Sequence, residues 1–271
     1  MPELPEVETT RRGLEPRLIG HRVRTLRLRD GRLRQPVPDT LARQLAGASI
    51  QALSRRGKYL LVGTDRGSAL IHLGMSGSLR MVNAALAPAP HEHYDWVLDN
   101  GQAMRYRDPR RFGMLLWAGR EPETHPLLRG LGPEPLGDTF DGDYLYRASR
   151  GRRVPVKNFL MNSHVVVGVG NIYASEALFH ACIHPHRPAG HIGGARYSLL
   201  AEAVKSVFVE AIAIGGTTLR DFVNAAGDPG YFAIRLAVYG REGEPCPRCG
   251  IPIRRSVIGQ RSSYYCPRCQ R

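Results

Sequence analysis

Apolar residues recur in two different patterns along the chain, and the pattern changes near residue 140. From about residue 22, short apolar runs are separated by glycines, at 59–62, 69–73, 96–98 and 114–117. Short runs with turn signals between them are typical of strands in a β-sandwich or barrel. Farther along, Leu200, Val204, Val207 and Ala211 repeat at helical spacing and predict a helix over 197–214, ended by the glycines that follow.

These patterns predict an α+β multidomain protein. Residues 5–18 form an expected N-terminal helix entered through Pro5, and a proline-rich stretch over 122–135 is an expected linker. Two further helical segments flank a glycine-rich break at Gly168 and Gly170. We therefore expect an N-terminal β-sandwich domain with an N-terminal helix over 1–133, a helical domain over 134–236 and a cysteine-rich module of short hairpins over 237–271.

The charge of the chain indicates which class of partner it binds. The 271 residues carry a formal net charge of +14 and 42% of them are hydrophobic, so a normal core is combined with a strongly basic surface. This excess favours a polyanion as partner, with a basic enzyme that binds no nucleic acid as the weaker alternative. The N-terminus has no signal-peptide pattern and no apolar run approaches the length of a membrane span, so we expect a cytoplasmic protein that contacts no membrane.

Four of the five cysteines lie close together in the sequence, in two pairs with two residues inside each pair. They are Cys246, Cys249, Cys266 and Cys269. In a cytoplasmic chain this spacing predicts one structural zinc ion with four thiolate ligands and no open position. The remaining cysteine, Cys182, is expected to be a small core residue in a helix.

Two basic features are candidates for DNA contact. The cysteine-rich module carries a surplus of arginines, and Arg261 is expected near the tip of its hairpin, although the zinc could serve only to stabilise this part of the chain. The break before Asn171 can direct backbone N–H groups at a phosphate, although a plain turn between helices would have the same sequence.

The N-terminus and the lysines suggest amine chemistry. Thirty-five of the 38 basic residues are arginine, which leaves Lys58, Lys157 and Lys205 as the only lysines. Arginine stays protonated at working pH, whereas an amine can lose its proton and react. Removal of Met1 would expose the secondary amine of Pro2 beside the carboxylate of Glu3. A nucleotide-biased genome would also produce many arginines, but it does not account for this N-terminus.

Five segments together resemble a known family. Residues 1–8, 72–77, 108–113 and 167–176 and the four-cysteine module are similar, in the same order, to bacterial formamidopyrimidine-DNA glycosylases. The resemblance covers the whole chain and implies a helix-two-turn-helix motif in the helical domain and a zinc-finger β-hairpin. It implies base-excision repair of double-stranded DNA that contains oxidised purines, such as 8-oxoguanine and formamidopyrimidines, or abasic sites.

The resemblance also assigns catalytic roles. Pro2 would attack C1′ of the damaged nucleotide and form a Schiff base that permits β,δ-elimination, which is the abasic-site lyase activity. Glu3 is similar to the general acid of the family, and Glu6 matches an acid that supports the amine. Lys58, which read alone is a solvated lysine at a strand edge, matches the proton donor for β-elimination. Arg261 matches the arginine assigned to δ-elimination.

Other residues match positions that hold the DNA. Met75, Arg110 and Phe112 resemble the side chains that fill the space left by the extruded base, although Met75 could be core filler and Phe112 a loop anchor. A further set matches residues that bind backbone phosphates or support the active site. These are His91, Arg152, Lys157, Asn171 and Glu176.

The sequence departs from the family pattern at two places. Asn162 stands where an aspartate is usual, so it can still accept a hydrogen bond but lacks the negative charge. The segment 216–232 resembles the lid over the extruded base, but Ala226, Asp228 and the pair Ile234 and Arg235 differ from the usual residues. These differences concern base recognition, since the residues matched to lyase chemistry are all present.

Two other functions remain as alternatives. A glycosylase of the endonuclease VIII type would have the same fold and act on oxidised pyrimidines. A zinc-ribbon protein that binds DNA without catalysis would use the same basic finger, but it would need neither Pro2 nor Lys58. A monomer is the expected state for an enzyme that holds DNA between two domains.

Overall fold

A computed structural model gives the arrangement of residues 2–215 and 236–271. These residues form two compact units, 2–129 with Gly215 and 130–214 with 236–271, and each unit is described by itself. The helical and cysteine-rich segments belong to the same second unit, which begins at Gly130. Met1, Ala226, Asp228, Ile234 and Arg235 lie outside the described residues, as does the segment 216–232.

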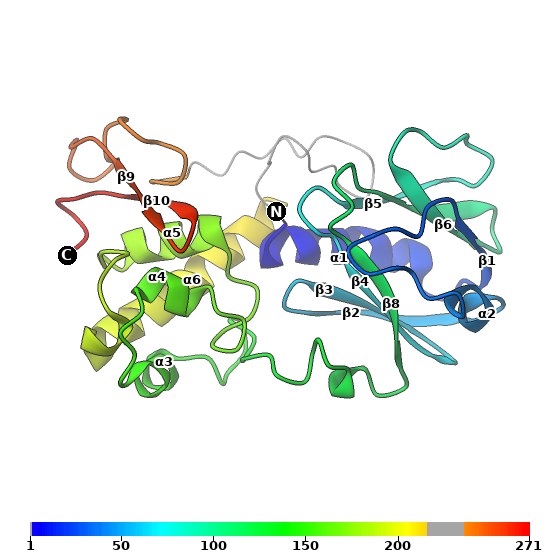
Figure 1. Ribbon diagram of the computed structural model, residues 1–271, viewed down its shortest axis with the longest axis horizontal. Helices are drawn as coiled ribbons and strands as arrows, with labels where there is room; N and C mark the ends of the chain where they lie inside the picture. The colour runs from blue at the N-terminus through cyan, green and yellow to red at the C-terminus, as the bar shows by residue number, and fades with distance from the viewer. Residues whose placement is uncertain (1, 216–235) are drawn as a thin grey trace. The chain divides into compact units, whose positions relative to one another are not determined.

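The first unit contains two antiparallel four-stranded sheets (Figure 1). One has the order β1-β6-β7-β5 and the other β2-β3-β4-β8. The strands are β1 (Val23–Leu28), β2 (Ile50–Arg56), β3 (Tyr59–Thr64), β4 (Gly67–His72), β5 (Ser78–Asn83), β6 (Glu92–Leu98), β7 (Gln102–Arg107) and β8 (Met114–Gly119). Apolar side chains of both sheets, such as Trp96 and Ile71, share one core, so the expected β-sandwich is confirmed.

Two helices and a short 3₁₀ turn complete the first unit. They are α1 (Leu4–Leu18), α2 (Leu41–Leu45) and η1 (Pro122–Thr124). Helix α1 packs against β2 and β3 and buries Val7, Leu14 and Leu18 in the core of the sandwich. This contact fixes the N-terminal segment of the chain on the sandwich.

The helical part of the second unit packs around the long helix α6. Its elements are α3 (Gly142–Ser149), α4 (Val156–Leu160), α5 (Asn171–His180), η2 (Ala189–His191) and α6 (Gly194–Ala213). The helix predicted over 197–214 is therefore present as α6, and it begins three residues earlier than expected. Tyr173 of α5 meets Phe208 of α6 edge to face, with ring centroids 5.2 Å apart, in a buried contact that joins these two helices.

The cysteine-rich segment forms a hairpin of β9 (Arg254–Ile258) and β10 (Arg261–Tyr265). Gly259 and Gln260 form the two-residue turn, and both have positive φ, as a type I′ turn requires. Arg261 is therefore the first residue of β10, directly after the tip. The hairpin packs on α5.

One expectation from the sequence is wrong. Cys182 follows the end of α5, has a positive φ of 56° and is half-buried, so it is neither helical nor a core residue. Its Sγ accepts a hydrogen bond from Nη1 of Arg248 at 2.9 Å.

In the described part of the chain, no helix is long and apolar enough to cross a membrane.

Candidate active site and nucleic-acid interface

Pro2 and Glu3 lie directly before the first residue of α1. Both are buried, and Glu3 is 2% exposed. Glu3 is the N-cap residue, and its backbone N–H donates to Oε2 of Glu6 at 2.8 Å in a capping box. Glu6 therefore fixes the backbone next to the predicted nucleophile, and its supporting role in the chemistry stays a prediction.

Lys58 lies in the two-residue turn between β2 and β3, after Gly57, which has a φ of 56°. The neighbouring Arg55 donates from Nε to Glu8 Oε2 at 3.1 Å and from Nη1 to the Gly57 carbonyl at 3.0 Å. Glu8 belongs to α1, so this arginine ties the turn that carries Lys58 to the helix that begins beside Pro2. Burial raises the pKa of Glu8, but hydrogen bonds from Arg11, Arg12 and Arg55 outweigh burial and lower it.

His72 is a residue near Lys58 to which the sequence assigns no role. Its ring lies 5.1 Å from that of Tyr59, and its Nδ1 accepts from the Gly74 N–H at 3.0 Å. Burial, together with the positive charges of Lys58 and Arg34, lowers the pKa of His72 to about 4. The ring is thus neutral at pH 7, and its acceptor nitrogen holds the start of the loop that carries Met75.

The three predicted void-filling residues lie on two adjoining loops of the first unit. Met75 is 37% exposed and Phe112 is 43% exposed, so neither is the core residue or buried anchor of the alternative interpretation. The guanidinium of Arg110 lies 5.0 Å from the centroid of the Phe112 ring, in a cation–π contact. Exposed apolar side chains on short loops are available to enter a DNA duplex.

His91 lies on a third loop of the first unit. It is exposed and has a positive φ of 69°. Its carbonyl accepts from the Asp108 N–H at 2.9 Å, and the next residue, Glu92, forms ion pairs with Arg80 and Arg105. His91 is therefore exposed while the backbone around it is fixed.

Asn171 begins α5 in the second unit, after the glycine-rich break. Its Nδ2 donates to the Ser262 carbonyl at 3.0 Å, while its buried Oδ1 has no hydrogen-bond partner. Tyr239, a residue not singled out from the sequence, places its hydroxyl 3.5 Å from Nδ2 of Asn171. The N-terminus of α5, Asn171 and Tyr239 therefore lie together beside the finger hairpin.

Lys157 and Arg261 are linked through this hairpin. The Lys157 side chain is fully buried, and its Nζ donates to the Ser262 carbonyl at 3.1 Å and to Ser263 Oγ at 2.7 Å. Arg261, directly before these two residues, is exposed. The ammonium of Lys157 thus fixes the strand that carries Arg261.

Glu176 has a clear local task. Its carboxylate accepts hydrogen bonds from the backbone N–H groups of 237–239, at 2.7 to 3.0 Å. These residues lead into the finger and include Tyr239, so Glu176 fastens the finger to α5. Arg152 lies after the end of α3 and is exposed, and its Nε donates a hydrogen bond to the Ala148 carbonyl at 3.1 Å.

Asn162 retains the hydrogen-bonding capacity expected of it. Its Oδ1 accepts from the His164 N–H at 3.0 Å, in the loop between α4 and α5. The missing negative charge therefore leaves the local turn intact.

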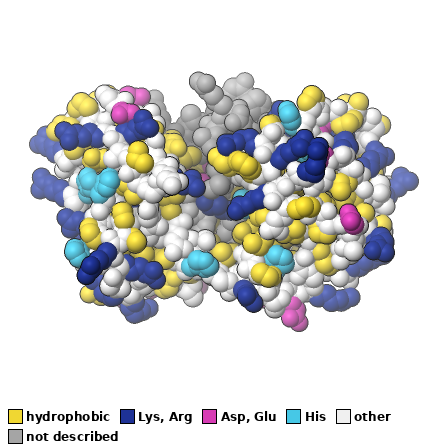
Figure 2. All heavy atoms as spheres, in the orientation of Figure 1, with side chains coloured by type: hydrophobic (Ala, Val, Ile, Leu, Met, Phe, Trp, Pro, Cys, Tyr) yellow, Lys and Arg dark blue, Asp and Glu magenta, His cyan; other side chains and the backbone are white. Residues whose placement is uncertain are grey.

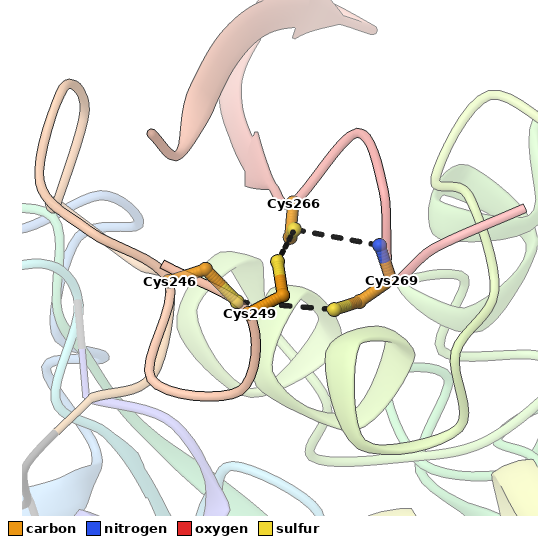
Figure 3. A group of neighbouring side chains, drawn as sticks. All are labelled: Cys246, Cys249, Cys266 and Cys269. Carbon is orange, nitrogen blue, oxygen red and sulfur yellow. Dashed lines mark hydrogen bonds between the residues drawn. The ribbon is translucent and has the colours of Figure 1, made fainter. Parts of the chain in front are cut away.

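The four expected zinc ligands converge, and Figure 3 shows their side chains pointing toward one another. All four sulfur atoms lie within 4.8 Å of one another, with Cys249 and Cys266 at 3.5 Å and Cys246 and Cys269 at 3.9 Å. A tetrahedral zinc ion with Zn–S bonds of about 2.3 Å requires sulfurs roughly 3.8 Å apart. The group therefore fits one structural zinc ion, which when bound cross-links the two cysteine pairs and leaves no position for catalysis.

On the face that Figure 2 shows, basic side chains occur on both units, with few acidic ones among them. This distribution agrees with the net charge of +14 and with a polyanionic partner.

Comparison with known proteins assigns the family. Residues 1–115 match the formamidopyrimidine-DNA glycosylase N-terminal domain, 131–223 match the H2TH domain of the same glycosylase, and 243–271 match a zinc finger found in FPG and IleRS. The chain belongs to the formamidopyrimidine-DNA glycosylase family. It is therefore a zinc-finger glycosylase of DNA base-excision repair, and the family resemblance noted in the sequence is confirmed.

Individual relatives agree over their full length. The formamidopyrimidine-DNA glycosylase of Stutzerimonas stutzeri is 59% identical over 271 residues, covering 100% of both chains. A mutant Lactococcus lactis FPG in complex with Fapy-dG containing DNA has a TM-score of 0.93 at 32% identity, with 100% of both chains covered. The Lactococcus lactis Fpg in complex with abasic site containing DNA has a TM-score of 0.92 at 32% identity, with 99% of both chains covered.

Proposed function

We propose that this protein excises oxidised purines, including 8-oxoguanine and formamidopyrimidines, from double-stranded DNA and then cleaves the abasic site by β,δ-elimination. The observation that carries the proposal is the buried Pro2–Glu3 pair at the start of α1, fixed by Glu6. The positive end of a helix dipole disfavours a cation, so it favours the neutral, nucleophilic form of an amine placed there. The complexes of related proteins with Fapy-dG and abasic-site DNA support the same substrates.

In the proposed reaction, the Pro2 nitrogen forms a bond to C1′ as the bond to the damaged base breaks. The proton donated by Glu3 goes to the ring oxygen of the sugar or to the departing base. After the nitrogen has lost its own proton, its lone pair displaces the ring oxygen from C1′, so the sugar ring opens and an iminium ion forms. This cation accepts the electrons released when a proton leaves C2′, so the 3′ phosphate departs. Lys58 is assigned to proton transfer in this β-elimination, and Arg261 to the loss of the 5′ phosphate in the δ-elimination.

DNA binding is assigned to residues of both units. Met75 and Phe112 fill the space left by the extruded base, and Arg110 contacts the unpaired partner base. His91, Arg152 and Asn171 bind backbone phosphates, and Tyr239 joins them because it lies beside Asn171. Lys157 contributes by fixing the hairpin of Arg261, since its ammonium is buried against that hairpin. Glu176 supports the site by holding the chain that leads into the finger.

Borohydride trapping tests the mechanism. The purified protein is incubated with an 8-oxoguanine duplex and sodium borohydride, and the reduced adduct is mapped by mass spectrometry after Met1 removal has been verified. We expect an adduct on Pro2. An adduct only with a thymine-glycol duplex would reassign the base specificity to oxidised pyrimidines. No adduct, even with an abasic duplex, would exclude the Schiff-base mechanism and favour a protein that binds DNA without catalysis.

A further inference from the structure

Asp108 lies at the meeting point of the loops that carry the predicted DNA-contacting residues of the first unit. Its side chain is fully buried, with 0% exposed. Oδ1 accepts from Ser76 Oγ at 2.8 Å and from the Arg110 N–H at 3.2 Å. Oδ2 accepts from the Gly113 N–H at 2.9 Å and from the Tyr106 hydroxyl at 3.1 Å. One carboxylate thus joins the loop of Met75 to both ends of the loop that contains Phe112.

The backbone of Asp108 reaches the third loop. Its N–H donates to the carbonyl of His91 at 2.9 Å, and its carbonyl oxygen accepts from Nε2 of His93 at 2.7 Å. His91 holds a positive φ of 69°, a conformation that needs support from its surroundings in a residue other than glycine. Asp108 supplies part of that support, so the position of His91 depends on the same residue.

The loop that carries Met75 and the loop that carries Phe112 also touch through their backbones. Gly74 has a φ of +72°, and a Cβ there would lie 2.5 Å from the Gly113 nitrogen and from the Phe112 carbonyl carbon. A displacement of one loop must therefore move the other. Met75 and Phe112 extend from this contact toward solvent.

The charge of Asp108 makes these links sensitive to change. Its two oxygens have four hydrogen-bond donors, one of which, the Tyr106 hydroxyl, also lies 3.1 Å from the Leu73 carbonyl. Among the described residues, no lysine or arginine forms an ion pair with it, so its buried charge is stabilised by these neutral donors. Burial raises the pKa of Tyr106, with smaller contributions from Tyr94 and Asp108, so this hydroxyl stays protonated and remains a donor.

We propose that Asp108 is a positioning residue that holds Met75, His91, Arg110 and Phe112 in one fixed arrangement, so that they engage the DNA together. The proposal rests on the function proposed above and adds a residue to which that function assigns no role. Asp108 itself touches neither substrate nor reacting atoms. It acts through the loops that it joins.

The proposed role separates two activities of the enzyme. Extruding an intact damaged nucleotide requires its base to be unstacked and unpaired, whereas an abasic nucleotide has no base to unstack. Residues that fill the vacated space should therefore matter more for base excision than for cleavage of a preformed abasic site. A general loss of folded protein would lower both activities equally.

The first test removes one link from the cluster. Ser76→Ala deletes the hydroxyl that binds Oδ1 and leaves Met75, the two backbone donors and Tyr106 in place. The matched control is Thr64→Val. Thr64 has the same 8% exposure as Ser76, and its hydroxyl donates to the Gly67 carbonyl rather than to Asp108. For each protein, kcat/KM is measured for excision from an 8-oxoguanine duplex and for cleavage of a preformed abasic duplex.

We expect Ser76→Ala to lower excision about 10-fold, as loss of a hydrogen bond to a charged group implies, with abasic-site cleavage changed by less than about twofold. Thr64→Val should leave both rates near wild type. Equal changes in the two activities of Ser76→Ala, or no change in either, would overturn the proposal. A wild-type protein that cleaves neither substrate would contradict the proposed function, and this outcome is recognised before any variant is compared.

A second measurement follows the unstacking of the DNA bases directly and does not depend on turnover. A 2-aminopurine base beside the lesion becomes fluorescent when it is unstacked, and stopped-flow mixing reports that step. Asp108→Asn places an amide N–H₂ opposite at least one backbone N–H, at Arg110 or at Gly113, so we expect the fluorescence change to slow about 10-fold or more. A wild-type fluorescence trace in a folded Asp108→Asn protein would refute the positioning role.

Discussion

Single titratable residues in this protein take their properties from burial and from charged or polar partners, both near and distant in the sequence. His72 is neutral because burial and nearby cations disfavour its proton, and Glu8 is ionised because three arginines surround it. Lys157 can be buried because Ser262 and Ser263, more than 100 residues later, accept hydrogen bonds from its Nζ. At this scale, the partners of a buried side chain decide whether it carries a charge.

The depressed pKa of His72 predicts a pH dependence of stability. The unfolded chain binds this proton with a pKa near 6.5, whereas the folded protein binds it only near pH 4, so the unfolded state holds more protons between these values. Stability from His72 is complete above about pH 6.5 and is lost as the pH falls toward 4. We expect a loss of about 2 kcal/mol between pH 7 and pH 4.5 in urea unfolding, after allowance for partial exposure.

His72→Asn provides the control, because its side-chain oxygen can still accept from the Gly74 N–H but does not titrate. The variant should lose less stability than wild type over the same pH range. Parallel curves for the two proteins would show that His72 is not the responsible group.

At the scale of elements, two hairpins place the two predicted catalytic cations in the same way. Lys58 lies in the turn after Gly57, and Arg261 directly follows the turn of Gly259 and Gln260. Both glycines have positive φ, so each tight turn depends on a residue without a side chain. Each hairpin is then fixed by a buried or half-buried partner, Arg55 in one case and Lys157 in the other.

Gly259 therefore controls the geometry before Arg261. An alanine there must adopt a φ of +54°, and its Cβ would lie 2.7 Å from the Asn158 side chain. This strain of about 1–2 kcal/mol should move the turn. We expect Gly259→Ala to raise the share of β-elimination product severalfold over δ-elimination product, on denaturing gels, with borohydride trapping unchanged.

Gly243→Ala is the control for this experiment, since Gly243 has a φ of +80° and no atom lies within 4 Å of the added Cβ. It incurs a similar backbone cost away from the turn. A wild-type product ratio in both variants would mean that the turn does not set the position of Arg261.

Sequence patterns predicted the elements whose apolar residues are continuous or periodic, such as β3, β4, α1 and α6. The pattern gave little sign of β7, because Arg105 is 1% exposed in that strand and looks like a surface residue in the sequence. It is buried because Asp95 and Glu92 bind its guanidinium from β6, which only the folded sheet brings near.

The same limit applies to the site. Cysteine spacing was sufficient for the zinc ligands, whereas the roles of Asp108 and Tyr239 depend on contacts between loops and between elements far apart in sequence.

At the scale of the whole molecule, the basic surface and the zinc finger work toward the same partner. A net charge of +14 attracts a polyanion without selecting a site, while the finger holds Arg261 on a rigid hairpin. Binding strength and placement therefore have different physical origins, and they respond to different perturbations.

Removal of the zinc ion should separate these two properties. A chelator that strips the metal leaves four cysteines without a cross-link, so the hairpin loses its base and Arg261 its position. We expect specific DNA binding, followed by fluorescence anisotropy, to be lost while circular dichroism still reports the folded sandwich. Added zinc should restore binding. Full affinity in protein shown to be metal-free by atomic absorption would contradict this role for the ion.

Salt titration tests the electrostatic contribution. Removing one side chain that binds a phosphate reduces the slope of log K against log salt by about 0.9 on duplex DNA. Arg152→Gln should show this reduction equally on lesion-containing and undamaged duplexes, because a phosphate contact carries no lesion information. Arg17→Gln, exposed in the last turn of α1, should bind like wild type. Equal slopes for Arg152→Gln and wild type would show that Arg152 binds no phosphate.

Reactive acyl donors in a cell attack proteins mainly at lysine amines, and this chain offers only three lysines. Lys157 is sealed inside the second unit, where its Nζ is held by the finger hairpin. Lys205 lies half-buried on α6, and its acylation removes one charge from a surface rich in arginine. Lys58 lies in the turn between β2 and β3, and it is the lysine whose modification would affect the proposed chemistry. Among the three lysines, acetylation should therefore affect the proposed chemistry through Lys58 alone and leave the attraction to DNA almost intact.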